Sequence, residues 1–331
     1  MLVIKQNESR NKIIFLAIVI GIIALLHYLT PTEPHTYHKL HIILRKLYFL
    51  PPVMAAAWFG LRGACVTASV VSVLFILHAF LDWPGNYMEQ ANQVGELAGF
   101  WVAGMISGWL FDRQRSLLVD LAKANEETLL GLVSALDLRE HNTSMHSQRV
   151  REYTELIARR LGVEEKALRE IGFGALLHDV GKIAVPDHIL LKPDKLTDVE
   201  WQEMRKHPAA GYRIVKRIGF LKEAAEVVHA HHERYDGKGY PRGLKGEDIP
   251  FGARMFMVAD VYDAMTSERP YHPAISYEEA AAEIMRMRGS QFDPVIVDAF
   301  MSIASDNLLS IAARYQNGEN KLPADVSLIS I

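Results

Sequence analysis

Cysteine is almost absent from this chain, which carries Cys65 alone among 331 residues. A single cysteine excludes an intramolecular disulfide framework and any zinc module built on Cys-x-x-Cys pairs. A metal ion would therefore have to be held by histidines and carboxylates. The sequence also lacks the glycine-rich GxxxxGK[ST] phosphate loop and a dinucleotide-binding fingerprint, and we find no cyclase or kinase segment.

An excess of positive charge is missing as well, because 36 Lys and Arg residues face 39 Asp and Glu residues, for a formal net charge of -3. This balance is not typical of proteins that coat nucleic acid, so we expect no nucleic-acid partner. Apolar residues make up 50% of the chain, and their excess lies in the first third. At roughly 150 residues per domain, the length predicts about two domains, one in the membrane and one in water.

Four apolar stretches in the first third are candidate membrane spans: 13–29, 47–61, 63–81 and 94–111. Lys5, Arg10 and Lys12 precede the first, and no small-x-small cleavage site follows it, which favours an uncleaved anchor over a signal peptide. Four spans would place both termini on the same side, with most flanking basic residues in the cytoplasm. We therefore predict a multi-pass membrane region over residues 1–111.

Several charged residues in this region need a separate explanation. Lys39, Arg45 and Lys46 would fall on the outer side, and we expect them on an amphipathic helix at the membrane surface. His78 and Glu96 are ionisable residues in or near the spans, which makes them candidates for signal sensing. Glu96 is close enough to the end of a span to be merely interfacial.

A helical linker is predicted over residues 112–138, which contain no proline and carry a short heptad-like seam. It could transmit membrane motion into the next domain, or pack on that domain as an ordinary amphipathic helix. Small residues spaced four apart within 95–108 permit close helix packing, either inside one bundle or across a homodimer. We expect the catalytic domain over residues 139–305 and a C-terminal tail over residues 306–331.

Helical periodicity continues through the second half of the chain, and β-type alternation is scarce. We predict helices over 150–161, 164–177, 198–218 and 221–231. Thr197 and Glu200 have the spacing of a capping box at the start of the third. The predicted fold class is all-α, in both the membrane region and the catalytic domain.

Histidines and aspartates gather at a few positions flanked by apolar residues. They are His146, the pair His178-Asp179, His207, the pair His231-His232, and Asp260. Imidazole and carboxylate are the usual ligands of divalent first-row metals. Several inward-facing ligands of this kind are costly to bury unless a metal satisfies them. Taken singly, each has an ordinary explanation: a His-Asp pair arises by chance, His231-His232 could lie on the surface, and Lys182 could be a solvated lysine.

Three longer strings resemble a known family. They are LLHDVGKI at 176–183, HHERYDGKGYP at 231–241 and VADVYDAMT at 258–266, followed by Arg269-Pro270-Tyr271. In this order they closely resemble the HD-GYP family, a branch of the HD metal-dependent phosphohydrolases that hydrolyses the bacterial messenger cyclic di-GMP. The resemblance covers about 129–304, more than half of the chain.

The resemblance implies a site with two divalent transition metal ions, iron or manganese being usual in that family. His146, His178, Asp179 and Asp260 would hold one ion, His207, His231 and His232 would complete the second, and Asp179 would bridge both. Lys182 would contact the phosphate and help to protonate the leaving oxygen. Tyr240, Asp263 and Arg269 would contact the ligand, and the loop Gly239-Tyr240-Pro241 could also present a surface to signalling proteins.

Two positions depart from the family pattern. Some members bind a third metal through a glutamate four residues before the first histidine, where this chain has Asn142, so we predict two metals. His272 stands where many members carry Lys or Arg, and its charge would vary near pH 6.5.

The implied function is a membrane-anchored cyclic di-GMP phosphodiesterase of the bacterial cytoplasmic membrane, with its catalytic domain in the cytoplasm. A bridging hydroxide between the two metals would open the ligand to pGpG, and further hydrolysis would give GMP. The membrane region would gate this activity. Two alternatives stay open: a receptor or scaffold that binds cyclic di-GMP or partner proteins with little turnover, and an HD phosphohydrolase for another nucleotide.

Overall fold

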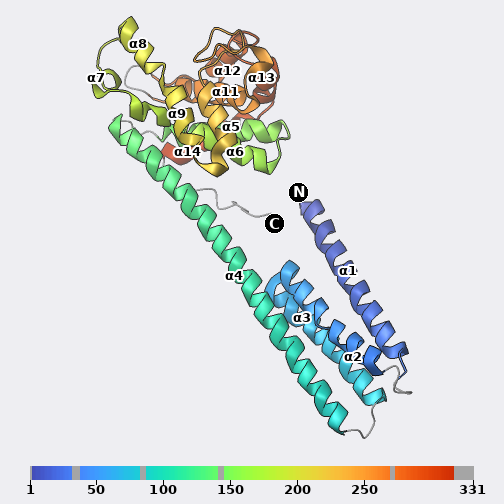
Figure 1. Ribbon diagram of the computed structural model, residues 1–331. Helices are drawn as coiled ribbons and strands as arrows, with labels where there is room; N and C mark the ends of the chain where they lie inside the picture. Colours follow the sequence, from blue (N-terminus) through green and yellow to red (C-terminus); the bar gives the residue numbers. More distant parts are fainter. Residues whose placement is uncertain (1, 32–37, 83–86, 141–144, 269–272, 317–331) are drawn as a thin grey trace. The chain divides into compact units, whose positions relative to one another are not determined.

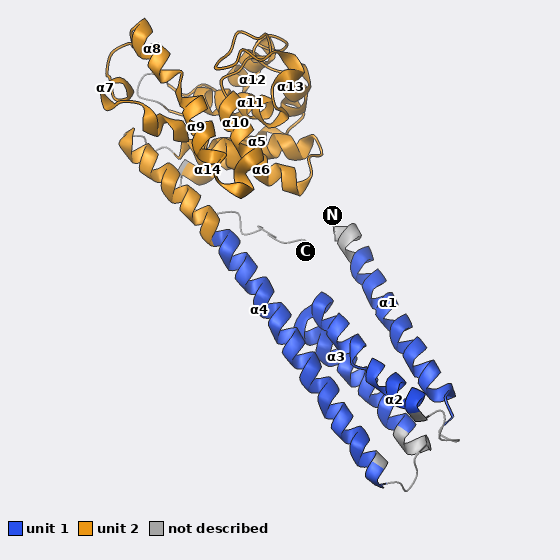
Figure 2. Ribbon diagram, viewed as in Figure 1, with its two compact units in different colours: residues 1–123, 328–331 blue, residues 124–327 orange. Residues whose placement is uncertain are grey.

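All regular elements among the residues described by the computed structural model are helices; those residues are 2–31, 38–82, 87–140, 145–268 and 273–316. The chain divides into two compact units, one over residues 1–123 and the other over residues 124–327 (Figure 2). An all-α fold was the expectation from the sequence, and the described residues confirm it.

The first unit contains α1 (Leu2–Leu29), α2 (His38–Leu47), α3 (Leu50–Asp82) and the first part of α4 (Tyr87–Arg139) (Figure 1). A small core of Ile23, Tyr48, Val71, Phe75 and Phe100 holds these helices together. Three described segments are long and apolar enough to cross a membrane, within Asn7–Leu29, Lys39–His78 and Gln90–Arg139. Large apolar side chains also cover the outside of this unit, as lipid contact would require.

The second of these segments folds back on itself at Gly60. Gly60 has φ 65° and ψ -154°, outside the helical region. The ring centroids of Tyr48 and Phe75 lie 5.7 Å apart, whereas a straight helix would separate them by roughly 40 Å. The predicted stretches 47–61 and 63–81 are therefore two separate antiparallel legs. The helix from Leu50 to the break is only about 15 Å long, shorter than the span predicted there.

Arg45 on α2 is buried, unlike Lys39 and Lys46 on the same helix, which are exposed. Its Nη2 lies 2.8 Å from Glu96 Oε1, and Lys46 Nζ lies 2.7 Å from the same oxygen. Arg45 is 4% exposed, because Glu96 on α4 supplies a counter-charge that a lipid-facing arginine would lack. Glu96 is accordingly the partner of two cations.

The predicted linker is part of α4, which runs without interruption from Tyr87 to Arg139. The second unit begins at Ala124, inside that linker. Leu129 and Val133 are buried against Leu176, Leu177 and other residues of the second unit. The last third of α4 thus packs on the second unit, as one of the two alternatives expected.

The helices of the second unit surround one large core, formed mainly by α5 (His146–Arg160), α6 (Glu165–Leu176), α11 (Phe251–Thr266) and α12 (Tyr277–Arg286). The remaining helices are α7 (Asp187–Leu190), α8 (Asp198–Met204), α9 (His207–Val215), α10 (Lys222–Ala230), α13 (Pro294–Met301) and α14 (Ser305–Gln316). The capping box of Thr197 and Glu200 is confirmed at the start of α8. The single helix predicted over 198–218 is two helices, because Pro208, the second residue of α9, lacks the N–H that a continuous helix would need there.

The predicted tail is wrong at its start, because α14 belongs to the domain. Leu308 and Ile311 are buried in the main core. The Tyr315 hydroxyl donates to Glu152 Oε1 on α5 at 2.6 Å, and Arg314 pairs with the same carboxylate. The short amphipathic helix α14 is therefore part of the domain, which extends to Gln316.

Truncating Leu308 tests this docking. Leu308 is 0% exposed, so Leu308→Ala should lower the free energy of unfolding of the second unit by about 2–5 kcal/mol. Its neighbour Leu309 is 49% exposed, and Leu309→Ala should cost no more than about 0.5 kcal/mol. Hydrogen exchange of the α5 amides in the full-length protein reports both values. Equal effects of the two variants would show that α14 does not pack on the core.

Candidate metal centre

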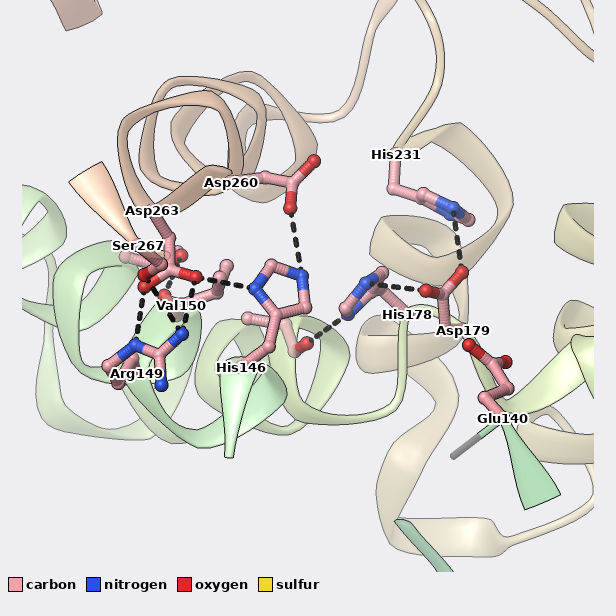
Figure 3. A network of polar contacts seen from close by, with 12 residues as sticks. Glu140, His146, Arg149, Val150, His178, Asp179, His231, Asp260, Asp263 and Ser267 are labelled. Atoms are coloured by element: carbon pink, nitrogen blue, oxygen red, sulfur yellow. Dashed lines mark hydrogen bonds and ion pairs between the residues drawn. The ribbon is translucent and has the colours of Figure 1, made fainter. Parts of the chain in front are cut away.

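Five separate segments of the second unit bring the predicted ligands together, and Figure 3 shows His146, His178, Asp179, His231 and Asp260 among them. His146 is the first residue of α5, and His207 is the first residue of α9. His178 and Asp179 lie between α6 and the short 3-10 helix η2 (Val180–Ala184). The other ligands are His231 and His232 directly after α10, and Asp260 within α11. All seven residues are described, and the structure gathers them at one place.

The ligand atoms form two groups. His146, His178 and Asp260 offer atoms within 4.8 Å of one another, and His207, His231 and His232 form a second group by the same measure. In the first, His146 Nε2 lies 3.2 Å from Asp260 Oδ1. In the second, the Nε2 atoms of His207 and His231 are 3.0 Å apart. Ligand atoms around one transition metal ion are separated by similar distances.

Asp179 lies between the two groups. Its Oδ2 is 3.1 Å from His178 Nε2, while its Oδ1 is 3.3 Å from His207 Nε2 and 3.9 Å from His231 Nε2. Oδ1 is buried and has no hydrogen-bond partner among the described residues. A buried carboxylate oxygen without a partner costs free energy. Cations on the two sides of Asp179 that share its carboxylate would satisfy it.

Backbone carbonyls orient three of the imidazoles. The Nδ1 atoms of His178, His207 and His231 donate to the carbonyl oxygens three residues earlier, at 2.8, 2.8 and 2.7 Å. These bonds place the proton on Nδ1 and leave the Nε2 lone pair facing the centre. Each of these histidines closes or opens a helix, where unpaired carbonyls are available. The donor set therefore fits divalent metal ions, on the evidence of its tautomers as well as its spacing.

Asp263 was expected to contact the ligand, and the structure corrects this. Its side chain is 0% exposed and accepts a hydrogen bond from His146 Nδ1 at 2.6 Å. Arg149 donates to the same carboxylate through Nε at 2.7 Å and Nη2 at 2.9 Å, and also to Ser267 Oγ. Asp263 therefore lies behind His146 and orients it. Its position three residues after Asp260 on the same helix was a signal for this role.

Charge within the centre favours cations. Burial would raise the pKa of Asp179, but the charge of Lys182 and the neighbouring rings of His178 and His207 hold it well below its usual range. Burial and neighbouring imidazoles lower the pKa of His231 well below its usual value and that of His232 to about 4. Both rings are thus neutral at pH 7, with lone pairs free to bind metal.

His146 shows the opposite behaviour. Burial would lower its pKa, but hydrogen bonds to Asp260 and Asp263 raise it to about 9. A metal ion taking the lone pair of His146 must displace that proton at neutral pH. Metal binding to the first group should therefore depend more strongly on pH than metal binding to the second group.

Lys182 lies beside the bridging carboxylate rather than in open solvent. Its Nζ is 2.8 Å from Asp179 Oδ2 and 3.1 Å from Glu140 Oε2, and these two charges raise its pKa despite burial. Sequence analysis missed Glu140, which follows the end of α4. Arg139 fixes the same segment by donating to the carbonyls of Lys182 at 3.0 Å and Val185 at 2.7 Å.

Tyr240 borders the second group. Its ring centroid is 4.7 Å from that of His232, and the Arg205 guanidinium lies 5.3 Å from the centroid of the Tyr240 ring. Glu233, which is buried, holds the loop by accepting from the backbone N–H groups of Arg242 and Leu244. The loop passes so close that a Cβ on Gly239 would lie 2.4 Å from the Glu233 Cα. Three sequence assignments, for Asn142, Arg269 and His272, lie outside the described residues.

The family comparison agrees with this geometry. Residues 132–296 match the family model of the HD domain, so this stretch is an HD domain. It includes all six residues of the two groups and Asp179 between them.

Curated relatives share the same part of the chain. A cyclic di-GMP phosphodiesterase response regulator of Xanthomonas campestris is 44% identical over 200 residues, covering 57% of this chain and 53% of the relative. A cyclic di-GMP phosphodiesterase of Thermotoga maritima is 42% identical, covering 51% of this chain and 47% of the relative. A 3'3'-cGAMP-specific phosphodiesterase of Vibrio cholerae is 38% identical, covering 56% and 36%. The chain spans about half the length or less of these relatives.

Neutralising Asp263 tests its role behind His146. Asp263→Asn keeps the shape but weakens the hydrogen bond from Nδ1, so metal affinity should fall about 10–100-fold. Asp293→Asn is a matched control, because Asp293 is buried and paired with Arg254 at 2.6 Å outside the two groups. Metal affinity is measured by competition with a chelator. An equal loss in both variants would indicate a general folding defect instead of an orienting role.

Proposed function

We propose that this chain is a metal-dependent phosphodiesterase that opens cyclic di-GMP to pGpG, and that GMP forms where hydrolysis continues. The observation that carries the proposal is the position of Asp179, shared by two histidine-rich groups and touching Lys182. The HD domain match and the names of the relatives support it. Iron or manganese is the metal we propose.

The residues of the chain divide the work. When bound, two divalent ions would supply an activated water and neutralise charge on the phosphate. The seven ligands would hold those ions, with the Asp179 carboxylate lying between the two groups. Lys182 carries a proton on Nζ beside the bridging carboxylate, in a position to interact with the phosphate and protonate the leaving 3'-oxygen. Tyr240 offers an aromatic face at the edge of the second group, suited to contact with the ligand.

The choice of substrate needs a separate argument, because one relative is named as specific for 3'3'-cGAMP. This makes 3'3'-cGAMP hydrolysis the alternative activity of the same site. The two cyclic dinucleotides differ in one base and share the phosphodiester chemistry. We favour cyclic di-GMP because the more similar relatives described above carry that name.

Turnover by the full-length protein tests the proposal. Purified anaerobically with Fe²⁺ or Mn²⁺, the protein should release pGpG from cyclic di-GMP faster than it cleaves 3'3'-cGAMP. Asp179→Ala should abolish release and lower the metal content, while the exposed control Asp194→Ala should change neither. Lys182→Ala should slow release and keep the metal. Tight binding of cyclic di-GMP without any product would establish a receptor instead, and faster cleavage of 3'3'-cGAMP would reverse the substrate assignment.

We also propose that the first unit lies in the bacterial cytoplasmic membrane and regulates the HD domain through α4. Support comes from the continuity of α4, which carries Glu96 in the first unit and Arg139 in the second. Glu96 is bound by α2 through Arg45, and Arg139 holds the carbonyls of Lys182 and Val185. A rotation of α4 would therefore reach the segment that carries Lys182. A homodimer through the membrane helices and linker, and signalling partners at the Gly239-Tyr240-Pro241 loop, are further proposals.

Insertions into α4 test this coupling. One alanine inserted after Ala122 turns the helix by about 100°, whereas seven residues restore its phase to within about 20°. In membranes, the single insertion should change phosphodiesterase activity several-fold, and the seven-residue insertion should keep it near the wild-type level. The same activity in both proteins would contradict coupling through the helix.

A further inference from the structure

Three buried histidines meet in the first unit, apart from the HD centre. His27 lies near the end of α1, His41 in α2 and His78 near the end of α3. Their exposed fractions are 1%, 0% and 1%. They come from three different helices, so the cluster exists only when the bundle is assembled. Sequence analysis singled out His78 alone.

The geometry of this histidine cluster (His27, His41 and His78) is that of ligands around one centre. Each residue offers a ring nitrogen, and these nitrogens lie within 4.8 Å of one another. The Nε2 atoms of His27 and His41 are 3.2 Å apart, close to the roughly 3.3 Å that separates two nitrogens on a tetrahedral zinc ion. The rings of His27 and His78 are stacked, with their centroids 3.8 Å apart. The edges of the two rings therefore lie side by side.

Hydrogen bonding within the cluster does not account for the burial of these three histidines together. One N–H···N bond satisfies a single pair of nitrogens, and His27 Nδ1 is buried with no hydrogen-bond partner among the described residues. Tyr28 is committed elsewhere, since its hydroxyl donates to the Leu74 carbonyl at 2.7 Å. Phe75 and Tyr48 close the surroundings, with ring centroids 6.1 and 5.5 Å from that of His27. A buried His27 nitrogen in such apolar surroundings is costly unless a ligand uses its lone pair.

Neutral polar groups are available to complete a coordination sphere. The Tyr48 hydroxyl is buried with no hydrogen-bond partner in the described part of the chain. Gln93 is also buried, and both atoms of its amide lack a partner there. Arg45 on α2 pairs with Glu96 on α4. His41 lies about one turn before Arg45, and Gln93 lies about one turn before Glu96. α2 and α4 run in the same direction here, because Phe49 packs on Phe100 farther along. Gln93 is therefore level with His41.

We propose that His27, His41 and His78 bind one divalent first-row transition metal ion inside the membrane region. Neutral imidazoles without a carboxylate favour Zn²⁺, Cu²⁺ or Ni²⁺ over Mn²⁺ and Mg²⁺. This selectivity differs from that of the HD centre, whose ligands include Asp179 and Asp260. Binding would tie α1, α2 and α3 together at one point. The site would thereby make metal availability an input to the membrane region.

Metal counting on the untagged full-length protein in lipid nanodiscs tests the proposal. After Zn²⁺ loading and dialysis, His78→Gln and His41→Gln should each retain one equivalent of zinc fewer than wild type. His188→Gln is the control, because His188 is exposed in the second unit and its loss should leave the count unchanged. After Cu²⁺ loading, the electron paramagnetic resonance spectrum should show coupling to imidazole nitrogens that disappears in His78→Gln.

These measurements do not depend on turnover, so they stand if the proposed phosphodiesterase activity fails. Unchanged helix content in each variant shows that a lost equivalent is not due to misfolding. Equal zinc content in wild type and both cluster variants would overturn the proposal and leave a cluster of hydrogen-bonded or titrating histidines.

Discussion

The carboxylate of Asp179 is the point on which the rest of the HD domain depends. One oxygen approaches His178 and Lys182, and the other approaches His207 and His231. His178 and Lys182 are close to Asp179 in the sequence, whereas His207 and His231 come from other segments, and one partly buried carboxylate contacts all four. Without cations, such an arrangement of acceptor oxygen and neutral imidazole nitrogens would be expensive to bury. When cations are bound, the same oxygen and nitrogen atoms act as their ligands, and the site binds metal selectively.

Helix ends supply the precision of the site. His146 and His207 begin helices, and His178 and His231 follow the ends of others. At three of these positions a carbonyl that would otherwise lack a partner takes the Nδ1 proton and fixes the ring. At the fourth, the buried pair of Asp263 and Arg149 does the same work. The apolar core behind α5, α6 and α11 keeps these ends in place.

The sequence predicted well which histidines and aspartates come together, because they lie in short strings whose order alone is informative. It did not predict the direction in which Asp263 points, since that depends on how α11 packs against α5. Glu140 was missed for a similar reason, because its partner Lys182 is distant in sequence. Gly60 offered a visible signal for the fold-back of α3. The burial of Arg45 and the meeting of His27, His41 and His78 arise only from the assembled bundle, which no single helix encodes.

The most direct test of the two-metal centre is anomalous X-ray scattering from crystals of the metal-loaded protein, recorded at the iron or manganese absorption edge. The account predicts two peaks in the HD domain, one on each side of the Asp179 carboxylate, with His146, His178 and Asp260 around one and His207, His231 and His232 around the other. A single peak away from Asp179, or none in the HD domain, would contradict it.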